Sequence, residues 1–319
     1  MNIILPGQYP RSEELVAATR DLDRNRIGQK EFEQIRKNDL ENFRILQNGL
    51  PYYSPGLFNW QDLMRPFADI LDGAKAGTLK RYFETNTFWR LLEAENGVKI
   101  KREKLDKWIE TYFFADGLFS TNDPMVFTLP FLYLFKEYSQ GISYEDVASL
   151  LETVYQKLSS FPNKLIVFSE PSFGWRKLSK EEQQLGQNFV KRLKTNNATP
   201  IFLNSYFFSI TQDLEFILSL SVDGIGIDFY ANSLKYILKE FPKNKSLLAG
   251  IINTQSTFIE TENIIQTFLQ EIGDHLPEQR LFLTYNGPAE LLPRDVMDQK
   301  IKNLQDTIQC LPKKSSHMK

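Results

Sequence analysis

The chain has 319 residues, 42% of them hydrophobic, and its 38 Lys and Arg residues nearly balance 40 Asp and Glu residues. A chain of this size can bury the core of one α/β barrel or of two smaller domains. The net charge of −2 gives no basic field, which argues against nucleic acid and membranes as partners.

Few residues of this chain can serve as soft metal ligands. They are His275, His317 and the single cysteine, Cys310. We expect both histidines at the surface and Cys310 as a semi-buried, inert thiol, so the sequence predicts no metal centre and no cofactor. A lone cysteine also excludes an internal disulfide framework. No long apolar run follows the opening MNIILPG, so we expect no signal peptide, no spanning helix and a cytoplasmic location.

The first half of the chain is helical at its start and ambiguous after that. Apolar residues recur at helical spacing between residues 12 and 50, with a break at Gly28, which predicts a helical lead-in over residues 1–50. Between residues 57 and 135 aromatic residues are dense and strands are hard to assign. The segments 67–77 and 102–114 are predicted to be helical.

The second half alternates short apolar runs with amphipathic helices. A helix over 143–158 begins with Ser143 and Asp146 at capping-box spacing. Five strand and helix pairs follow, with strands at 164–168, 200–203, 224–229, 247–252 and 280–285, and helices at 180–193, 212–220, 232–241, 262–272 and 294–308. This series favours parallel strands with right-handed crossovers. We therefore predict a TIM-like (β/α)8 barrel as one domain over residues 1–310, followed by a polar tail at 311–319.

Polar residues follow each of these five strands, where barrel proteins build their sites. Asp228 and Glu170 are the candidate catalytic carboxylates. Chance placement of polar strand ends explains any one such residue, but five strands in a row favour a pocket. Candidate ligand-binding residues are Arg11, Ser205, Tyr206, Gln255, Asn286 and Trp175, with Asn253 beside them.

Several candidates have a purely structural alternative. Trp175 either stacks on a planar ligand or packs against its neighbours. Arg11 either binds a carboxylate or phosphate, or pairs with Glu13 or Glu14 at the start of a helix. Tyr206 either donates its hydroxyl to the pocket or belongs to the core.

Seven segments in chain order carry a resemblance to a known family. They are PGQYPRSEEL, NWQDLMRPF, RYFETNTFWR, SEPSF, VDGIGIDF, LLAGIINTQSTFIET and NGPAELLP. Together they resemble the cobalamin-independent methionine synthases, in the compact single-barrel form rather than the long two-barrel form. The resemblance implies a barrel that binds homocysteine on zinc and transfers a methyl group to its sulfur, with His, Cys, Glu and Cys as zinc ligands.

The chain departs from the family at the positions of those ligands. The family's His-x-Cys-Tyr corresponds here to Leu203-Asn204-Ser205-Tyr206, so Leu203 and Ser205 stand at the His and Cys positions. The family's glutamate corresponds to Asp228 and its last cysteine to Gly287. Only one carboxylate remains. In this respect the chain resembles the zinc-less N-terminal barrel of the long enzymes.

Three functions stay open at this point. The first is a zinc-free accessory barrel that is the partner of a separate zinc-bearing methionine synthase chain and takes homocysteine or a methyl donor as its small-molecule ligand. The second is a methyltransferase that works without zinc, with Asp228 and Glu170 as acid and base. The third is another activity on the same barrel, such as decarboxylation or binding of a pterin or corrinoid methyl carrier, for which Arg11 and Arg176 are candidates.

Overall fold

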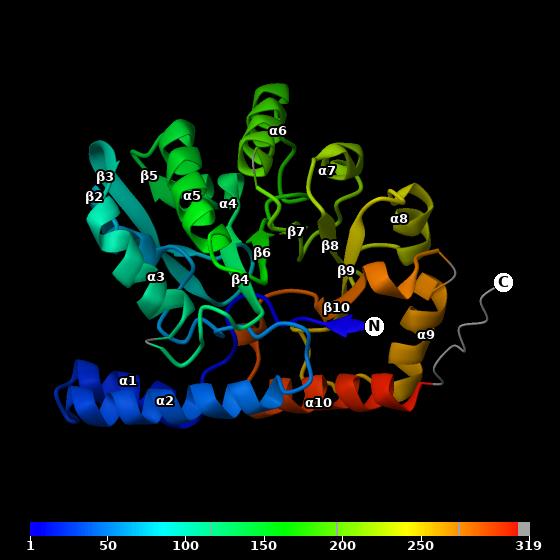
Figure 1. Ribbon diagram of the computed structural model, residues 1–319, viewed down its shortest axis with the longest axis horizontal. Helices are drawn as coiled ribbons and strands as arrows, with labels where there is room; N and C mark the ends of the chain where they lie inside the picture. The colour runs from blue at the N-terminus through cyan, green and yellow to red at the C-terminus, as the bar shows by residue number, and fades with distance from the viewer. Residues whose placement is uncertain (116, 196, 274, 312–319) are drawn as a thin grey trace.

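The protein folds around a curled parallel sheet, seen in a computed structural model that describes residues 1–115, 117–195, 197–273 and 275–311 (Figure 1). Within these residues seven strands form the sheet in the order β1-β10-β9-β8-β7-β6-β4. The strands are β1 (Asn2–Ile3), β4 (Met125–Pro130), β6 (Lys164–Ser169), β7 (Ile201–Asn204), β8 (Gly224–Asp228), β9 (Ser246–Ile252) and β10 (Leu281–Tyr285).

Helices cover the outer side of this sheet (Figure 1). They are α4 (Leu132–Glu137), α5 (Tyr144–Ser159), α6 (Lys180–Lys194), α7 (Leu214–Ser219), α8 (Leu234–Glu240), α9 (Glu262–Gly273) and α10 (Arg294–Cys310). Capping boxes begin two of them, from Ser143 and Asp146 at α5 and from Ser179 and Glu182 at α6. The five predicted strand and helix pairs are confirmed.

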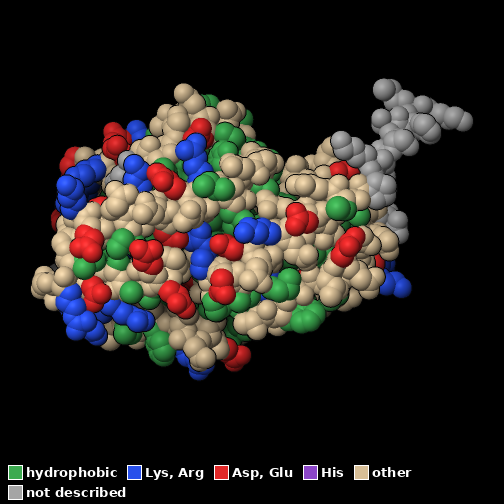
Figure 2. Space-filling model, turned by 90° about the horizontal axis from the view of Figure 1, so that it is seen from below, with side chains coloured by type: hydrophobic (Ala, Val, Ile, Leu, Met, Phe, Trp, Pro, Cys, Tyr) green, Lys and Arg blue, Asp and Glu red, His purple; other side chains and the backbone are tan. Residues whose placement is uncertain are grey.

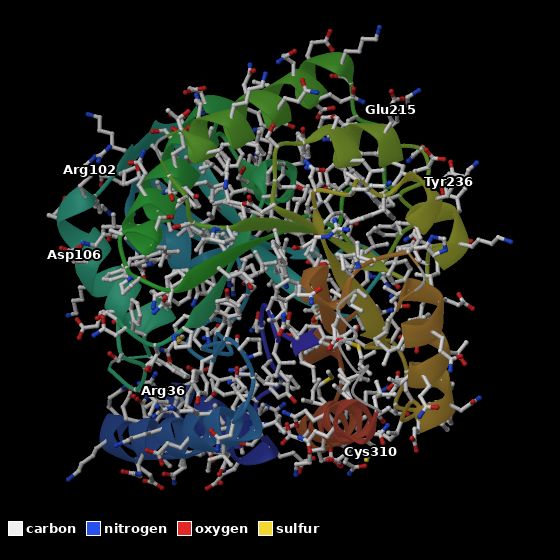
Figure 3. All side chains as sticks on the ribbon, turned by 45° about the vertical axis from the view of Figure 1, so that its right-hand side comes forward. Arg36, Arg102, Asp106, Glu215, Tyr236 and Cys310 are labelled. Atoms are coloured by element: carbon white, nitrogen blue, oxygen red, sulfur yellow. The ribbon has the colours of Figure 1, made fainter. Side chains whose placement is uncertain are left out.

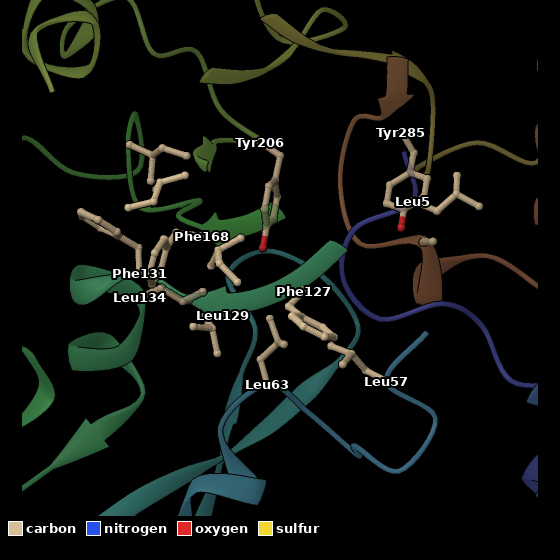
Figure 4. Packing of buried hydrophobic residues seen from close by; sticks show 14 of the residues in the cluster. Leu5, Leu57, Leu63, Phe127, Leu129, Phe131, Leu134, Phe168, Tyr206 and Tyr285 are labelled. Atoms are coloured by element: carbon tan, nitrogen blue, oxygen red, sulfur yellow. The ribbon is translucent and has the colours of Figure 1, made fainter. Parts of the chain in front are cut away.

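Both faces of the parallel strands are buried, and successive side chains point to opposite faces. Val126, Val167, Phe202 and Leu248 form a small cluster with Ile4 and Leu165. Their sequence neighbours belong to the main core, whose packing on either side of β4 is shown in Figure 4. This alternation decides which polar residues at the strand ends face the inside of the barrel.

The barrel does not close completely. Tyr53 forms a single parallel bridge to Met125 of β4, and the Tyr9 amide donates to the Gly56 carbonyl at 3.0 Å. The eighth strand is therefore reduced to a bridge. Pro51 and Pro55 flank it, and proline has no N–H to donate to a sheet ladder. The predicted barrel class is confirmed, as a half-barrel.

The predicted lead-in is helical and lies beside α10 (Figure 1). It consists of α1 (Glu13–Asp23) and α2 (Gln29–Leu46). Arg294 connects α10 to the lead-in, because its guanidinium donates to Asp39 of α2 at 2.8 Å and to the Pro10 carbonyl at 3.3 Å. On the face that these helices form, basic and acidic side chains are intermixed (Figure 2).

A long antiparallel hairpin replaces the helix predicted for 67–77, so that prediction was wrong. The hairpin consists of β2 (Leu71–Arg81) and β3 (Phe88–Ile100), and β5 (Ser139–Gln140) pairs with β3. Most of β2 is exposed, so its sequence lacks the alternation of a half-buried strand. The helix predicted at 102–114 is confirmed by α3 (Leu105–Phe113).

Short 3-10 turns complete the described structure. They are η1 (Arg65–Asp69), η2 (Arg102–Lys104), η3 (Glu278–Arg280) and η4 (Ala289–Leu291). None of the helices in the described ranges is long and apolar enough to cross a membrane. The predicted tail lies outside the described residues from 312 onward.

Candidate functional site

A small cavity lined by both apolar and polar residues lies at the mouth of the barrel, where the strands end. It measures about 20 Å³, which is room for a single water molecule. Ser169 and Asn204 end β6 and β7 and, by the alternation along their strands, face the inside of the barrel. The lining residues are Pro6, Gly7, Gln8, Leu63, Trp89, Ser169, Asn204, Tyr206, Tyr285, Gly287, Pro288 and Glu290.

Glycine in β8 keeps the inner face of this mouth compact. A Cβ on Gly226 would lie 2.1 Å from Asn204 Oδ1. The side chain of Asn204 therefore packs directly on Gly226 of β8, and any residue larger than glycine at position 226 would displace it.

Two buried polar atoms of the cavity lining have no hydrogen-bond partner among the described residues. They are the side-chain oxygen of Gln8 and the indole nitrogen of Trp89, and these residues are only 6% and 1% exposed. The other end of the Gln8 amide donates to the Trp60 carbonyl at 3.0 Å. Because buried polar atoms are rarely left unpaired, one acceptor and one donor here are available to a ligand.

Glu290 lines the cavity and interacts electrostatically with Arg11. Burial raises the pKa of Glu290 to about 8, and the positive charge of Arg11 opposes that rise. Burial lowers the pKa of Arg11, which Glu290 and Asp39 oppose. The charge of Arg11 thus acts on Glu290 of the cavity lining, although Arg11 itself does not line the cavity. Sequence reasoning missed Glu290, although its position five residues after the last strand was the available signal.

The protonation of Glu290 has a measurable consequence for stability. Its folded pKa of about 8 lies above an unfolded value of about 4.3, so the folded chain holds a proton that the unfolded chain releases. Stability therefore falls as pH rises between these two values. We expect Glu290→Gln to reduce this fall between pH 5 and pH 8 in urea unfolding, with exposed Glu271→Gln as control. Equal pH profiles for Glu290→Gln and wild type would show that Glu290 is charged in the fold.

Asp228 is buried and its carboxylate is fully engaged. One oxygen accepts from the amides of Tyr230 at 2.8 Å and Ala231 at 3.2 Å, and from the Asn286 side chain at 3.1 Å. The other accepts from the Phe207 amide at 3.2 Å. Burial raises the pKa of Asp228 and these hydrogen bonds oppose the rise. The geometry gives Asp228 the role of holding the loops after β7 and β8 together.

Glu170 points away from the mouth, toward α4. Its two oxygens accept from the amides of Leu134 at 2.8 Å and Ser172 at 2.9 Å. Burial raises the pKa of Glu170 to about 7. Glu170 and Asp228 hold different loops, and neither lines the cavity. The structure therefore does not bring the two candidate carboxylates together as an acid and base pair.

The other candidates divide between the mouth and the surface. Tyr206 lines the cavity, and its hydroxyl lies 2.7 Å from that of Tyr82. Ser205 donates to the Gly226 carbonyl at 3.2 Å. The remaining candidates lie outside the cavity lining. Asn286 is buried and accepts from the Thr254 amide, while Asn253 accepts from the amide of the exposed Gln255.

The last two candidates lie nearer the surface. Trp175 is 43% exposed and packs against Phe208, and Arg176 forms an ion pair with Glu182.

The residues at the family's zinc positions do not fit a zinc ion. Zinc sites in proteins use thiolate, imidazole or carboxylate ligands, whereas Leu203, Ser205 and Gly287 offer none of these and Asp228 is already engaged. Within the part of the chain that the structure describes, no group of three His, Cys, Asp or Glu residues comes together. No chemical step can therefore be assigned to zinc here.

The soft ligands lie elsewhere. His275 is exposed, as expected, and His317 lies outside the described residues. Cys310 is exposed at the end of α10 (Figure 3), so its prediction as semi-buried was wrong. The final helix continues through Cys310 and turns it toward solvent.

A curled parallel sheet with outer helices and polar residues at the carboxyl ends of its strands defines an α/β barrel protein of the TIM type. The family model described as "Cobalamin-independent synthase, N-terminal domain" matches residues 69–277. The chain therefore belongs to the cobalamin-independent methionine synthase family.

Individual relatives agree with this assignment. The 5-methyltetrahydropteroyltriglutamate–homocysteine methyltransferase of Lactococcus lactis subsp. cremoris MG1363 is 27% identical over 220 residues, which cover 66% of this chain and 29% of the relative. That of Thermotoga sp. RQ2 is 25% identical over 294 residues, covering 82% and 39%. The chain thus spans about a third of the length of these relatives.

Solved structures share the fold at full length. A B12-independent methionine synthase from Shewanella sp. W3-18-1, in complex with selenomethionine, has a TM-score of 0.74 at 14% identity and covers 97% of both chains. A putative enzyme of this kind from Listeria monocytogenes has a TM-score of 0.69 at 16% identity and covers 95% of both.

Proposed function

We propose that this chain is a zinc-free accessory barrel that associates with a separate zinc-bearing methionine synthase homologue and raises its rate of methyl transfer. The observation that carries the proposal is that the carboxylate of Asp228 is occupied by hydrogen bonds. It is the one carboxylate left at the family's zinc positions, and four hydrogen bonds already occupy it. The fold is kept while the groups that activate the thiol are replaced, which is what an accessory role requires.

Methyl transfer by this chain alone is a weaker alternative. A free thiol has a pKa of about 8.5 and stays mostly protonated near neutral pH unless a metal or a base activates it. Neither Asp228 nor Glu170 lines the cavity, so neither is placed to take the thiol proton. We expect no methylation of homocysteine by the isolated chain with either a folate or a corrinoid donor, measured as methionine formed.

Binding of a small amino acid at the mouth is a second candidate function, favoured by the unpaired atoms there. Gln8 offers an acceptor and Glu290 a carboxyl group to an amino group, while Trp89 and Arg11 offer donors and positive charge to a carboxylate. The Shewanella homologue was solved with selenomethionine, an amino acid. Homocysteine and methionine are the ligands that this proposal names.

The accessory proposal is tested by mixing the chain with a zinc-bearing homologue. We expect the two to co-purify and methyl transfer by the homologue to become faster. Arg11→Ala should reduce the stimulation without preventing association if the mouth contributes, and the exposed Arg26→Ala serves as the matched control. If no complex forms at micromolar concentrations and the homologue's rate is unchanged, the accessory role is wrong.

A further inference from the structure

The tip of the β2–β3 hairpin contributes one wall of the mouth cavity through Trp89. Tyr82 and Trp89 flank the turn and are 0% and 1% exposed, although most of β2 is in contact with solvent. The ring of Tyr82 stacks on Trp89 at 3.6 Å, and Trp89 belongs to the cavity lining. The hairpin is thus buried chiefly where it meets the barrel mouth.

Side chains make the contact between this tip and the barrel loops. The Tyr82 hydroxyl lies 2.7 Å from that of Tyr206. The ring of Phe83 packs against Phe208 and Trp175 at 5.8 and 5.7 Å. Among the described residues, the backbone of the turn makes no hydrogen bond to the loops that carry these partners. Separating the tip from these loops breaks no hydrogen bond of the main sheet. The tip backbone is held instead by the Tyr138 hydroxyl, which accepts from the Phe83 amide at 3.0 Å and donates to the Arg81 carbonyl at 2.9 Å.

The ladder of the hairpin is irregular below its tip, whereas the pairs next to the turn, from Leu79 and Arg90 to Arg81 and Phe88, are regular. Phe83 has a φ of 46°, a left-handed conformation that bulky residues keep only where their surroundings impose it. Two register shifts interrupt the ladder with β3, between Asp72 and Ala74 and between Ala76 and Leu79. Such irregularities disrupt ladder hydrogen bonds and allow a strand to bend.

We propose that the hairpin tip is a gate, which opens when Tyr82 separates from Tyr206 and so admits a ligand to the cavity beneath it. In the closed form the cavity of about 20 Å³ holds no more than one water molecule. A larger ligand reaches the unpaired atoms of Gln8 and Trp89 only if the tip moves. The proposal rests on ligand binding at the mouth, the second candidate function, and adds how access to that site is controlled.

Tyr82→Phe tests the gate, because it removes only the hydroxyl that contacts Tyr206. Tyr206 itself keeps a hydrogen bond with the Ser169 side chain, and Tyr82 does not line the cavity. Tyr236→Phe is the matched control, since Tyr236 lies exposed on α8 (Figure 3). Hydrogen exchange of residues 82–92 and of strand β8 is measured in all three proteins, together with calorimetric binding of L-methionine.

The loss of one buried hydrogen bond corresponds to a change of about 3- to 10-fold in the opening equilibrium. We expect Tyr82→Phe to speed exchange of the tip amides by that factor and leave β8 unchanged. The Kd for methionine should fall by a similar factor, because a larger fraction of the protein is competent to bind. Tyr236→Phe should change neither quantity.

The possible outcomes test the gate and the identity of the ligand separately. If tip amides exchange only together with β8, or if Tyr82→Phe leaves their exchange unchanged, the gate is wrong. Equal Kd values for wild type and Tyr82→Phe would also overturn it, while leaving the binding site in place. Faster tip exchange without methionine binding to either protein would support a mobile tip and reject an amino acid as the ligand that it admits.

Discussion

Asp228→Ala is expected to lower the free energy of unfolding by about 3–5 kcal/mol, because it leaves several buried donors without an acceptor. Those donors are the amides of Phe207, Tyr230 and Ala231 and the side chain of Asn286. Urea denaturation measures the change directly.

Two further variants show whether the loss belongs to this carboxylate. Asp228→Asn keeps one oxygen acceptor and should lose less stability than Asp228→Ala. Asp295→Ala, at an exposed position in the first turn of α10, should have almost no effect. If Asp228→Ala is as stable as wild type, the carboxylate is not structural, and a direct chemical role becomes the better interpretation.

Arg294→Ala should have an effect of similar size, about 3–5 kcal/mol, because it leaves a buried charge uncompensated. The side chains of Arg294 and Asp39 are 10% and 5% exposed and lie 2.8 Å apart. Arg294 also pairs with Asp298 at 2.9 Å, and its guanidinium lies over the Tyr9 ring at 5.3 Å. Loss of this group would weaken the attachment of α2 and the opening segment to α10, which the bonds of Gln305 to Leu46 and of Tyr9 to Asp298 would still maintain.

A double-mutant cycle tests this explanation. Asp39→Asn removes the charge that Arg294 compensates, so Arg294→Ala should cost less in the Asp39→Asn background than in the wild type. Urea denaturation of the four proteins gives the coupling free energy. Strictly additive losses would show that the pair of Arg294 with Asp39 contributes nothing and that the effect of Arg294→Ala comes from its other contacts.

The sequence predicted the second half of the fold well because each strand and helix there carries its own local signal. The run KLIVF is buried over its whole length in β6, and helix α5 begins with the capping box that Ser143 and Asp146 predicted. The first half failed where stability comes from distant partners. Strand β2 contains glycine, alanine and lysine, and its conformation depends on pairing with β3. Tyr53 bridges a strand about seventy residues later in the sequence.

The candidate site was predicted only in part, because strand ends identify a region but not the direction of each side chain. Ser169 and Glu170 are neighbours, yet Ser169 lines the cavity while Glu170 bonds to Leu134 of α4. Gln8, Trp89 and Glu290 come from three distant segments. Trp89 reaches this site only because it belongs to the β2–β3 hairpin, which the sequence did not predict.

Zinc analysis of the purified chain tests the central claim most directly. The protein is incubated with zinc, dialysed against metal-free buffer, and its metal content is measured. We expect no stoichiometric zinc, since Leu203, Ser205 and Gly287 supply no zinc-binding group and Asp228 is engaged by its neighbours. Retention of one zinc ion per chain, lost on replacement of Asp228 by Ala in a variant that is still folded, would contradict the account.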